Sequence, residues 1–323
     1  MSEIVAIDIG GTHARFAIAR VGGGRVAELG AECTLETAAY ATFEDAYDSF
    51  ANRAGRPLPD AAAVALAGPI EGEPLKLTNN PWLIRPSLLR ERLNGGCLLL
   101  VNDFAAVAHA VAQVDATYFR PICGPDGLLP NVGVATIVGP GTGLGVAQLI
   151  RGDGGYRVVA TEGGHIGFAP VDALDDAVLG RLRERYGRVS AERVASGPGL
   201  RNIYETLCGI GGQPSGAGDD RAIWRAAIAG EDPVAKAALD RFCLKLGAVA
   251  GDIALAHGAQ AVVIAGGVGL RLAGHLRGSS FRAGFLAKGR FARHMKEMPV
   301  SILTHPQPGL FGAAAAFAAE YPD

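Results

Sequence analysis

The stretch that decides the fold is IVAIDIGGTHARF, residues 4–16. An apolar strand runs into a carboxylate, two glycines and a hydroxyl, and a second strand follows. Gly10 and Gly11 can adopt the positive φ of a tight turn and leave backbone N–H groups uncovered. Asp8 can hold the water shell of a cation, and Thr12 can donate to a phosphate. The pattern predicts a hairpin that faces a phosphate, although this segment alone also fits an ordinary Gly-Gly turn.

Length and composition limit the class of protein. A chain of 323 residues is long enough for two domains that each bury a core. Hydrophobic residues at 49% and charged residues at 19% indicate a compact globular protein and exclude a disordered one. The formal net charge of −2 gives no electrostatic reason to expect nucleic acid or a membrane surface as a partner.

The N-terminus and the cysteines indicate a cytoplasmic protein. Glu3 is acidic and Asp8 comes too early for a signal peptide, and no apolar run approaches the roughly 20 residues of a membrane helix. The cysteines form no CxxC pair and are odd in number, which fits reduced thiols rather than a disulfide scaffold. They are Cys33, Cys97, Cys123, Cys208 and Cys243.

Strands and helices alternate along the chain, as in α/β proteins. The second strand pair surrounds the turn 139–143 and repeats the plan of the first hairpin. Proline and glycine make the stretch 121–130 the best candidate for a domain boundary by composition. We expect strands at 4–9, 14–21, 25–34, 97–101, 132–138, 145–150 and 261–265, with an apolar run at 61–67. We expect helices at 42–54, 104–111, 239–253 and 310–319.

Familiar nucleotide motifs do not account for the glycine-rich turns. The chain contains no Gly-Lys dipeptide, which excludes a Walker A loop. The spacing Gly22, Gly24, Ala27 resembles a dinucleotide fingerprint but lies between two expected strands rather than opening a helix. What remains are turns near 8–12, 139–143 and 265–269, and the two hairpins in separate halves suggest a nucleotide held in a cleft between domains.

Acid–base candidates lie between these turns. Asn102 and Asp103 follow the strand 97–101, where they fit either a catalytic pair or a helix cap. Glu162 and His165 flank two glycines, an arrangement suited to vicinal hydroxyls, although a lone histidine is often structural. Glu192 fits a ligand contact, and it also fits the first turn of a helix begun by Ser190.

Six segments together resemble the bacterial glucokinases, in order and over essentially the whole chain. They are DIGGTHAR (8–15), TNNPW (78–82), NDF (102–104), VGPGTGLG (138–145), EGGH (162–165) and ERVASGPG (192–199). The resemblance implies the two-domain actin-like ATPase fold, hexokinase-type and ribonuclease H-like, with an interdomain cleft. On that fold we expect a smaller α/β domain at residues 1–112 plus 303–323 and a larger one at 113–302.

The resemblance also implies an activity and its residues. The expected reaction is phosphorylation of the 6-hydroxyl of D-glucose by Mg-ATP, at the entry to glycolysis, by a cytoplasmic homodimer. Asp103 is implied as the base and Asp8 as a Mg²⁺ contact through water. Glucose is expected at Asn79, Asn102, Asp103, Glu162, His165 and Glu192, and ATP phosphates at Asp8, Gly10, Gly11, Thr12, Arg15, Gly139, Gly141, Thr142, Gly143, Gly266 and Gly267.

One departure places the chain within its superfamily. The related repressor, open-reading-frame and kinase family follows its Glu-Gly-Gly-His segment with a CxCGxxGC zinc cluster, and no cysteine lies between His165 and Glu192 here. The resemblance is therefore to the zinc-free branch, and we expect no zinc. Two alternatives stay open: a kinase for fructose, mannose or an N-acetylhexosamine, and a non-catalytic sugar-sensing regulator. The regulator is disfavoured because no helix-turn-helix precedes the first strand.

Overall fold

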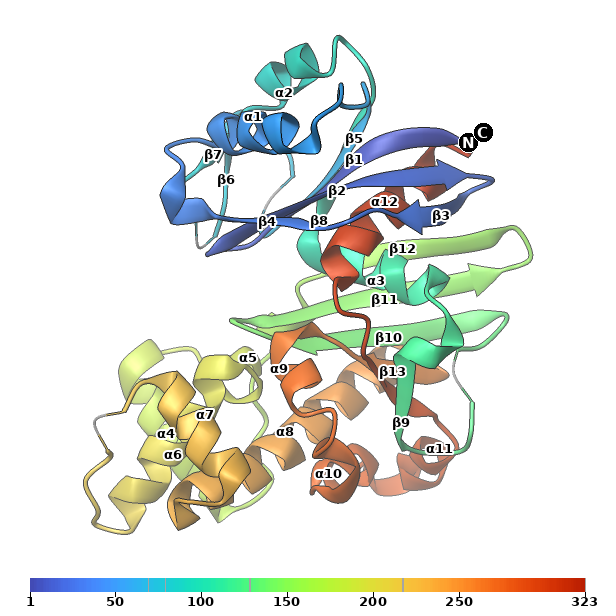
Figure 1. The fold of residues 1–323 in the computed structure, drawn as a ribbon. Coiled ribbons are helices and arrows are strands. Elements are labelled where there is room, and N and C mark those ends of the chain that lie inside the picture. The colour runs from blue at the N-terminus through green and yellow to red at the C-terminus, as the bar shows by residue number, and fades with distance from the viewer. Residues whose placement is uncertain (69, 79, 128, 217, 323) are drawn as a thin grey trace. The chain divides into compact units, whose positions relative to one another are not determined.

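The computed structural model describes residues 1–322 except 69, 79, 128 and 217. The chain divides into two compact units, Met1–Asp115 with His305–Asp323, and Ala116–Thr304 (Figure 1). The division precedes the stretch 121–130, so the boundary expected there from composition is wrong. The first residues of that stretch belong to β9 (Phe119–Cys123), which pairs with β14 (Val300–Leu303) inside the second unit.

The first unit is built on a mixed sheet in the order β3-β2-β1-β5-β8, with β4 also pairing with β2. The strands β1 and β2 form the predicted antiparallel hairpin, whereas β1, β5 and β8 run parallel. The expected single strand at 25–34 is two strands, which pair with different parts of β2. The bounds are β1 Ser2–Ile9, β2 His13–Gly22, β3 Arg25–Leu29, β4 Cys33–Glu36, β5 Ala62–Leu66 and β8 Leu98–Asn102.

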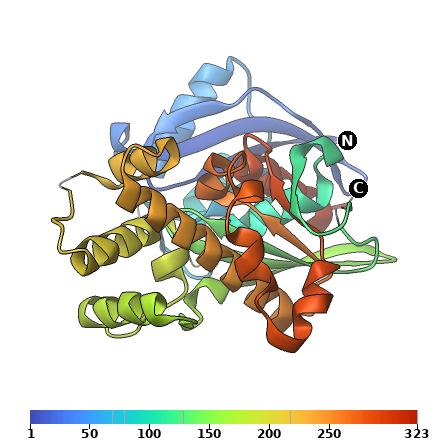
Figure 2. The ribbon, with the colours of Figure 1, turned by 90° about the horizontal axis from the view of Figure 1, so that it is seen from below.

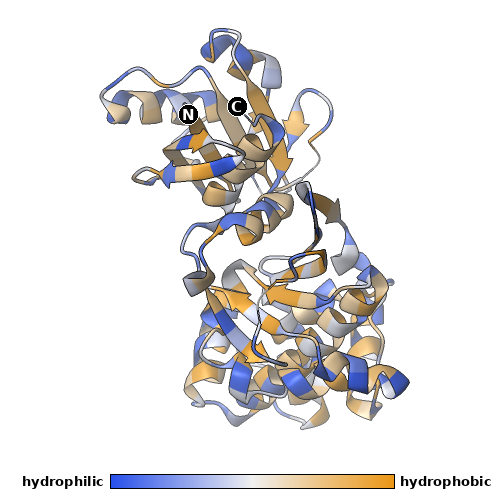
Figure 3. Cartoon of the chain, turned by 90° about the vertical axis from the view of Figure 1, so that its right-hand side faces the viewer, coloured by the Kyte–Doolittle hydropathy of each residue, from blue (hydrophilic) through white to orange (hydrophobic). Residues whose placement is uncertain are grey.

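Helices cover the sheet of the first unit, and a short hairpin of β6 (Leu75–Lys76) and β7 (Leu83–Ile84) lies beside it. An aromatic cluster fills one side, where the Phe16 ring stacks on Phe43 and Phe50 at centroid distances of 6.4 and 5.1 Å. Apolar strand residues of the unit, among them Ile4, Ile7 and Val64, are buried, and Figure 3 colours the chain by hydropathy. The helices are α1 Phe43–Ala54, α2 Pro86–Arg92, α3 Asp103–Gln113 and α12 Pro308–Glu320, with the short turn η1 at Thr37–Ala39.

The C-terminal helix α12 belongs to the core of this unit, as its apolar pattern predicts. Residues 312–318 are all buried, and α12 lies against α3. The two helices approach so closely that a Cβ on Gly312 would lie 1.8 Å from the carbonyl oxygen of Ala106. The segment 308–320 therefore completes a core whose strands come from the start of the chain.

The second unit repeats the plan with a sheet in the order β12-β11-β10-β13-β14-β9. Its antiparallel pair β10 and β11 is continued by β12, while β13 and β14 run parallel to β10. The predicted helix at 239–253 is the middle of α8, a helix of 25 residues that contacts β10 and β13 (Figure 2). The remaining strands are β10 Gly133–Pro140, β11 Leu144–Gly152, β12 Gly155–Thr161 and β13 Ala261–Ile264, and α8 spans Pro233–His257.

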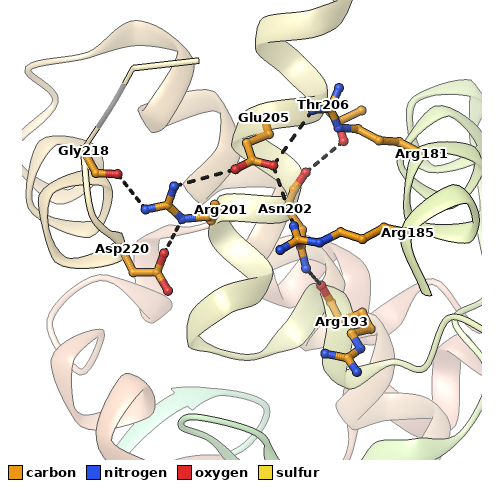
Figure 4. A network of polar contacts seen from close by, with 9 residues as sticks. All are labelled: Arg181, Arg185, Arg193, Arg201, Asn202, Glu205, Thr206, Gly218 and Asp220. Atoms are coloured by element: carbon orange, nitrogen blue, oxygen red, sulfur yellow. Dashed lines mark hydrogen bonds and ion pairs between the residues drawn. The ribbon is translucent and has the colours of Figure 1, made fainter.

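Further helices enclose the core of this unit and carry a polar network on their surface. Glu205 lies 3.7–3.9 Å from the guanidinium groups of Arg181, Arg185 and Arg201 (Figure 4). Arg201 also pairs with Asp220, which ties α6 to the start of α7. Partly exposed ion pairs of this kind contribute little to stability. The helices are α4 Ala173–Tyr186, α5 Glu192–Ala195, α6 Gly197–Ile210, α7 Asp220–Ala229, α9 Gly266–Arg271, α10 Phe281–Leu286 and α11 Ala292–Lys296, with short turns η2 Ala116–Tyr118, η3 Gly163–His165, η4 Leu276–Gly278 and η5 Gly289–Phe291.

The first unit should lose stability in mild acid through His109 on α3. Burial lowers the pKa of His109 to about 4, whereas an unfolded histidine has a pKa of about 6.5. The unfolded chain therefore takes up this proton first, and the stability present above pH 6.5 is lost as the pH falls toward 4. The loss at pH 5 should be about 2 kcal/mol.

Urea unfolding of wild type and His109→Gln at pH 7 and pH 5 measures this loss. The variant should lose about 2 kcal/mol less than wild type between the two pH values. His294→Gln is the control, because His294 is exposed on α11. Equal losses in wild type and His109→Gln would show that His109 does not cause the acid sensitivity.

Candidate active site

The first glycine hairpin is the turn 10–12 between β1 and β2. The amide of Gly10 donates to the carbonyl oxygen of His13 at 2.9 Å, and Asn80 Nδ2 donates to the carbonyl oxygen of Gly10 at 3.0 Å. The φ angle of Gly10 is not positive, in contrast to the tight-turn conformation considered for it from the sequence. The N–H of Gly10 is used inside the turn, and the expected contact of Gly10 with a phosphate stays a prediction.

The next two residues of the turn are held by Thr37. Its hydroxyl donates to the carbonyl oxygen of Gly11 at 3.1 Å, and its amide donates to that of Thr12 at 3.0 Å. Within the described part of the chain, the amides of Gly11 and Thr12 have no hydrogen-bond partner. The Thr12 hydroxyl lies 2.9 Å from His13 Nδ1. Two backbone donors are thus available for an anion.

The carboxylate of Asp8 lies at the end of β1, next to the start of α12. A Cβ on Gly309 would lie 2.8 Å from Asp8 Cγ, so this close approach requires glycine. Burial raises the pKa of the Asp8 carboxyl, and the guanidinium of Arg15 at 3.3 Å opposes that rise. Arg15 also lies 3.6 Å from Glu32. The guanidinium of Arg15 therefore lies beside two carboxylates rather than within the turn 10–12.

Asn102 and Asp103 follow β8, and the register of the sheet brings them to the edge that carries Asp8. Ile9 pairs with Leu66, and Leu66 pairs with Asn102, so the three parallel strands end together. The side chain of Asn102 caps α3 by accepting from the amides of residues 104 and 105, both at 3.0 Å. The cap considered for this pair therefore belongs to Asn102.

Asp103 is the first residue of α3 and is half-buried. Its Oδ1 accepts from the amide of Phe104 at 2.8 Å, a donor that it shares with Asn102. Because Asn102 supplies the cap, the carboxylate of Asp103 is not needed to begin the helix.

The second glycine hairpin is the turn 141–143 between β10 and β11. The amide of Gly141 donates to the carbonyl oxygen of Gly143 at 2.9 Å, and the amide of Gly197 donates to the carbonyl oxygen of Gly141 at 2.7 Å. The amide of Gly141 is therefore used inside the turn, as is that of Gly10, and the expected nucleotide contact of Gly141 stays a prediction. Among the residues that the structure places, the amides of Thr142 and Gly143 have no partner.

Three glycines next to this turn have different structural roles. Gly139 lies within β10 and pairs with Gly145 rather than forming part of the turn. Gly266 begins α9 at a φ of 77°, and a Cβ there would lie 2.7 Å from the carbonyl oxygen of Pro140. Gly267 would accept a Cβ without any contact within 4 Å. The turn expected at 265–269 is thus the start of a helix that lies on the end of β10.

Glu192 reaches the second hairpin from α5, where it is the first residue. Its Oε2 accepts from the amide of Leu144 at 3.2 Å, and a Cβ on Gly143 would lie 2.6 Å from the same oxygen. Glu192 therefore occupies the first turn of a helix, as one alternative held, and also contacts the glycine hairpin.

The segment 162–165 approaches the same end of β11. A Cβ on Gly164 would lie 2.1 Å from the carbonyl oxygen of Leu144, which explains the glycine. The side chains of Glu162 and His165 are 86% and 58% exposed, and Glu162 Oε2 lies 3.9 Å from His165 Nε2. Both are open to a ligand. Leu144 thus contacts the Glu-Gly-Gly-His segment as well as Glu192.

The predicted residues form two groups, one in each unit. The first unit brings together Asp8, Asn102 and Asp103 at one sheet edge, and the second brings Glu162, His165 and Glu192 to the start of β11. Asn79 lies outside the described residues. Sequence reasoning missed the residues that hold the turns, Thr37, Asn80 and Gly197. Asn80 and Gly197 lie within the six quoted segments, whereas Thr37 lies in none of them, so no sequence pattern pointed to it.

The two sheets, each with a glycine hairpin followed by parallel strands, place the protein in the class of actin-like ATPase folds. The chain belongs to the glucokinase family, whose family model matches residues 5–320. A glucokinase of Zymomonas mobilis subsp. mobilis is 60% identical over 319 residues, which cover 99% of this chain and 98% of that protein.

Solved structures agree with this assignment. The glucokinase from an Antarctic psychrotroph has a TM-score of 0.85 at 33% identity, covering 98% of each chain. A ROK family glucokinase from Streptomyces griseus, in complex with glucose and AMPPNP, has a TM-score of 0.62 at 21% identity. It covers 99% of this chain and 100% of its own, and a likeness at that identity supports the fold alone.

Proposed function

We propose that this protein is a glucokinase that transfers the γ-phosphoryl group of ATP to the 6-hydroxyl of D-glucose, forming glucose 6-phosphate and ADP. The observation that carries the proposal is the family match over residues 5–320. The position of Asn102 and Asp103 adds to it, because both follow β8 at the sheet edge that carries Asp8. The Streptomyces griseus protein is in complex with glucose and AMPPNP, and we take ATP as the donor here by analogy with it.

In this proposal Asp103 orients the 6-hydroxyl and accepts its proton while the oxygen bonds to the γ-phosphorus and the bond to ADP breaks. A carboxylate is a weak base, but it need only take the proton as bonding to phosphorus proceeds. Asn102 can donate its side-chain N–H groups to the sugar, because its cap uses only Oδ1. Glu162, His165 and Glu192 bind further hydroxyls, and Asn79 remains a proposed sugar contact.

The nucleotide phosphates are assigned to the open amides of the two hairpins, those of Gly11, Thr12, Thr142 and Gly143. Such donors stabilise charge on the moving phosphoryl group. The resemblance also implies that Gly266 and Gly267 contact the ATP phosphates. This proposal rests on their place at the start of α9.

Asp8 fits the role of a Mg²⁺ contact through water. No cluster of three or more His, Cys, Asp or Glu side chains suited to a metal occurs in the part of the chain that the structure describes. Mg²⁺ commonly binds through one or two carboxylates, water and substrate phosphates, so a single carboxylate beside the phosphate turn suffices. When bound, the ion would neutralise charge on the β- and γ-phosphates.

The proposal extends to the setting of the reaction. We place the enzyme in the cytoplasm, where ATP is available, and Cys33, Cys97, Cys123, Cys208 and Cys243 are free thiols, as is usual in a reducing compartment. The structure contains, in its described residues, no helix long and apolar enough to cross a membrane. A homodimer follows from the resemblance and can be checked by light scattering after size-exclusion chromatography.

A coupled assay across glucose, fructose, mannose and N-acetylglucosamine, with ATP, ADP and polyphosphate as donors, tests the proposed reaction. Glucose with ATP should give the highest kcat/KM. A higher kcat/KM for another hexose would assign the enzyme to that sugar. A higher kcat/KM with ADP or polyphosphate would contradict ATP as the phosphate donor.

The second hairpin can be tested with Gly141→Val. A Cβ at residue 141 meets no atom within 4 Å and the residue lacks a positive φ, so the substitution should not strain the turn. The added side chain should instead crowd the phosphates, raising the KM for ATP about 10-fold, equivalent to roughly 1.4 kcal/mol. Calorimetric glucose binding without nucleotide should stay within about twofold.

Gly154→Val provides the matched control. Residue 154 is exposed, its Cβ would also meet nothing within 4 Å, and it follows the far end of β11. The control should leave both constants unchanged. Normal ATP kinetics in Gly141→Val would remove the turn 141–143 from the nucleotide site.

A further inference from the structure

We propose that Thr37 is a positioning residue for the nucleotide, whose hydroxyl fixes the direction in which the Thr12 amide points. The proposal rests on the phosphate site assigned to the turn 10–12 above. Thr37 is 4% exposed and begins η1, directly after β4. It contacts the turn through two donors, its hydroxyl and its amide.

The geometry of the peptide bond turns these contacts into control of the amides. In a planar trans peptide the C=O of one residue points opposite to the N–H of the next. Holding the carbonyl of Gly11 therefore sets the direction of the Thr12 N–H. The bond from Asn80 to the carbonyl of Gly10 sets the Gly11 N–H in the same way. Each open amide of the turn is thus set by one buried or half-buried side chain.

The two bonds made by Thr37 can be separated by mutation. Its amide bond to the carbonyl of Thr12 belongs to the backbone and survives a change of side chain. Its hydroxyl bond to Gly11 does not survive in Thr37→Val, which keeps the branched shape but lacks the donor. Backbone donors stabilise a phosphate best when they already point toward it before it binds. Loss of the Thr37 hydroxyl bond should therefore weaken the use of ATP before it destabilises the fold.

Steady-state kinetics of Thr37→Val and Thr37→Ser test the proposal. Thr37→Val should raise the KM for ATP about 5- to 10-fold, the size expected for one hydrogen bond, with the KM for glucose within about twofold. Thr37→Ser retains the hydroxyl and should restore the KM for ATP to within about twofold of wild type. A merely structural residue would change both KM values together and would not be rescued by serine.

A normal KM for ATP in Thr37→Val, or equal changes in both constants, would overturn the proposal. If Thr37→Val does not fold, Thr37→Ala removes the same hydroxyl from a smaller side chain, and the same comparison with Thr37→Ser applies. Calorimetric titration with AMPPNP keeps the test separate from the proposed reaction. A wild type that binds AMPPNP but does not phosphorylate glucose would refute the function, while weaker AMPPNP binding in Thr37→Val would still support the positioning role.

Discussion

Asp103→Asn should lower kcat by about 10²–10⁴-fold while the protein remains folded. The substitution removes the proton acceptor but keeps the shape of the side chain and an oxygen that can accept from Phe104. The cap of α3 is provided by Asn102, so the helix start should survive. A coupled or quenched assay of turnover measures the change in kcat, and circular dichroism checks that the variant is folded.

Asn102→Asp, which changes the residue next to Asp103, is the variant to compare with Asp103→Asn. It preserves the cap oxygen and removes the side-chain N–H groups that would donate to glucose. We expect it to raise the KM for glucose while retaining more turnover than Asp103→Asn. Near-normal kcat in Asp103→Asn would show that this carboxylate only supports the start of α3.

Glu192→Gln should raise the KM for glucose about 10- to 100-fold, with a much smaller change in the KM for ATP. A carboxylate accepts charge-assisted bonds from hydroxyls that are worth roughly 1.5–3 kcal/mol, and an amide replaces them poorly. Glutamine can still accept from the Leu144 amide through its side-chain oxygen, so the hairpin contact should persist.

Glu184→Gln is the matched control for this change. Glu184 is an exposed residue of α4, and its loss should leave both KM values unchanged. Equal rises in the KM for glucose and for ATP in Glu192→Gln would instead indicate that Glu192 mainly supports the turn 141–143.

Local sequence patterns predicted the elements that depend on local physics. The hairpins around 10–12 and 141–143 follow from apolar strands interrupted by glycines, and α8 follows from its helical spacing. The burial of α12 was also predictable, because its segment is apolar on nearly all sides. Proline and glycine content misplaced the domain boundary, since Pro121 lies within β9 and Gly124 directly follows it, and a strand at the edge of a sheet tolerates proline.

The details of the site depended on contacts between distant segments. Whether Gly10 and Gly141 offer their amides depends on backbone bonds inside each turn, which glycine content does not reveal. Thr37 is 26 residues from the carbonyl that it holds and belongs to no motif. The choice between Asn102 and Asp103 as the cap required coordinates, because both residue types suit that position.

Phosphorus NMR of the purified protein with ATP and glucose follows both products of the proposed transfer in one sample. Glucose 6-phosphate and ADP should accumulate in equal amounts, and both products should fall together in Asp103→Asn. Formation of ADP with inorganic phosphate and no glucose 6-phosphate, or the same rate in Asp103→Asn as in wild type, would contradict the proposed transfer.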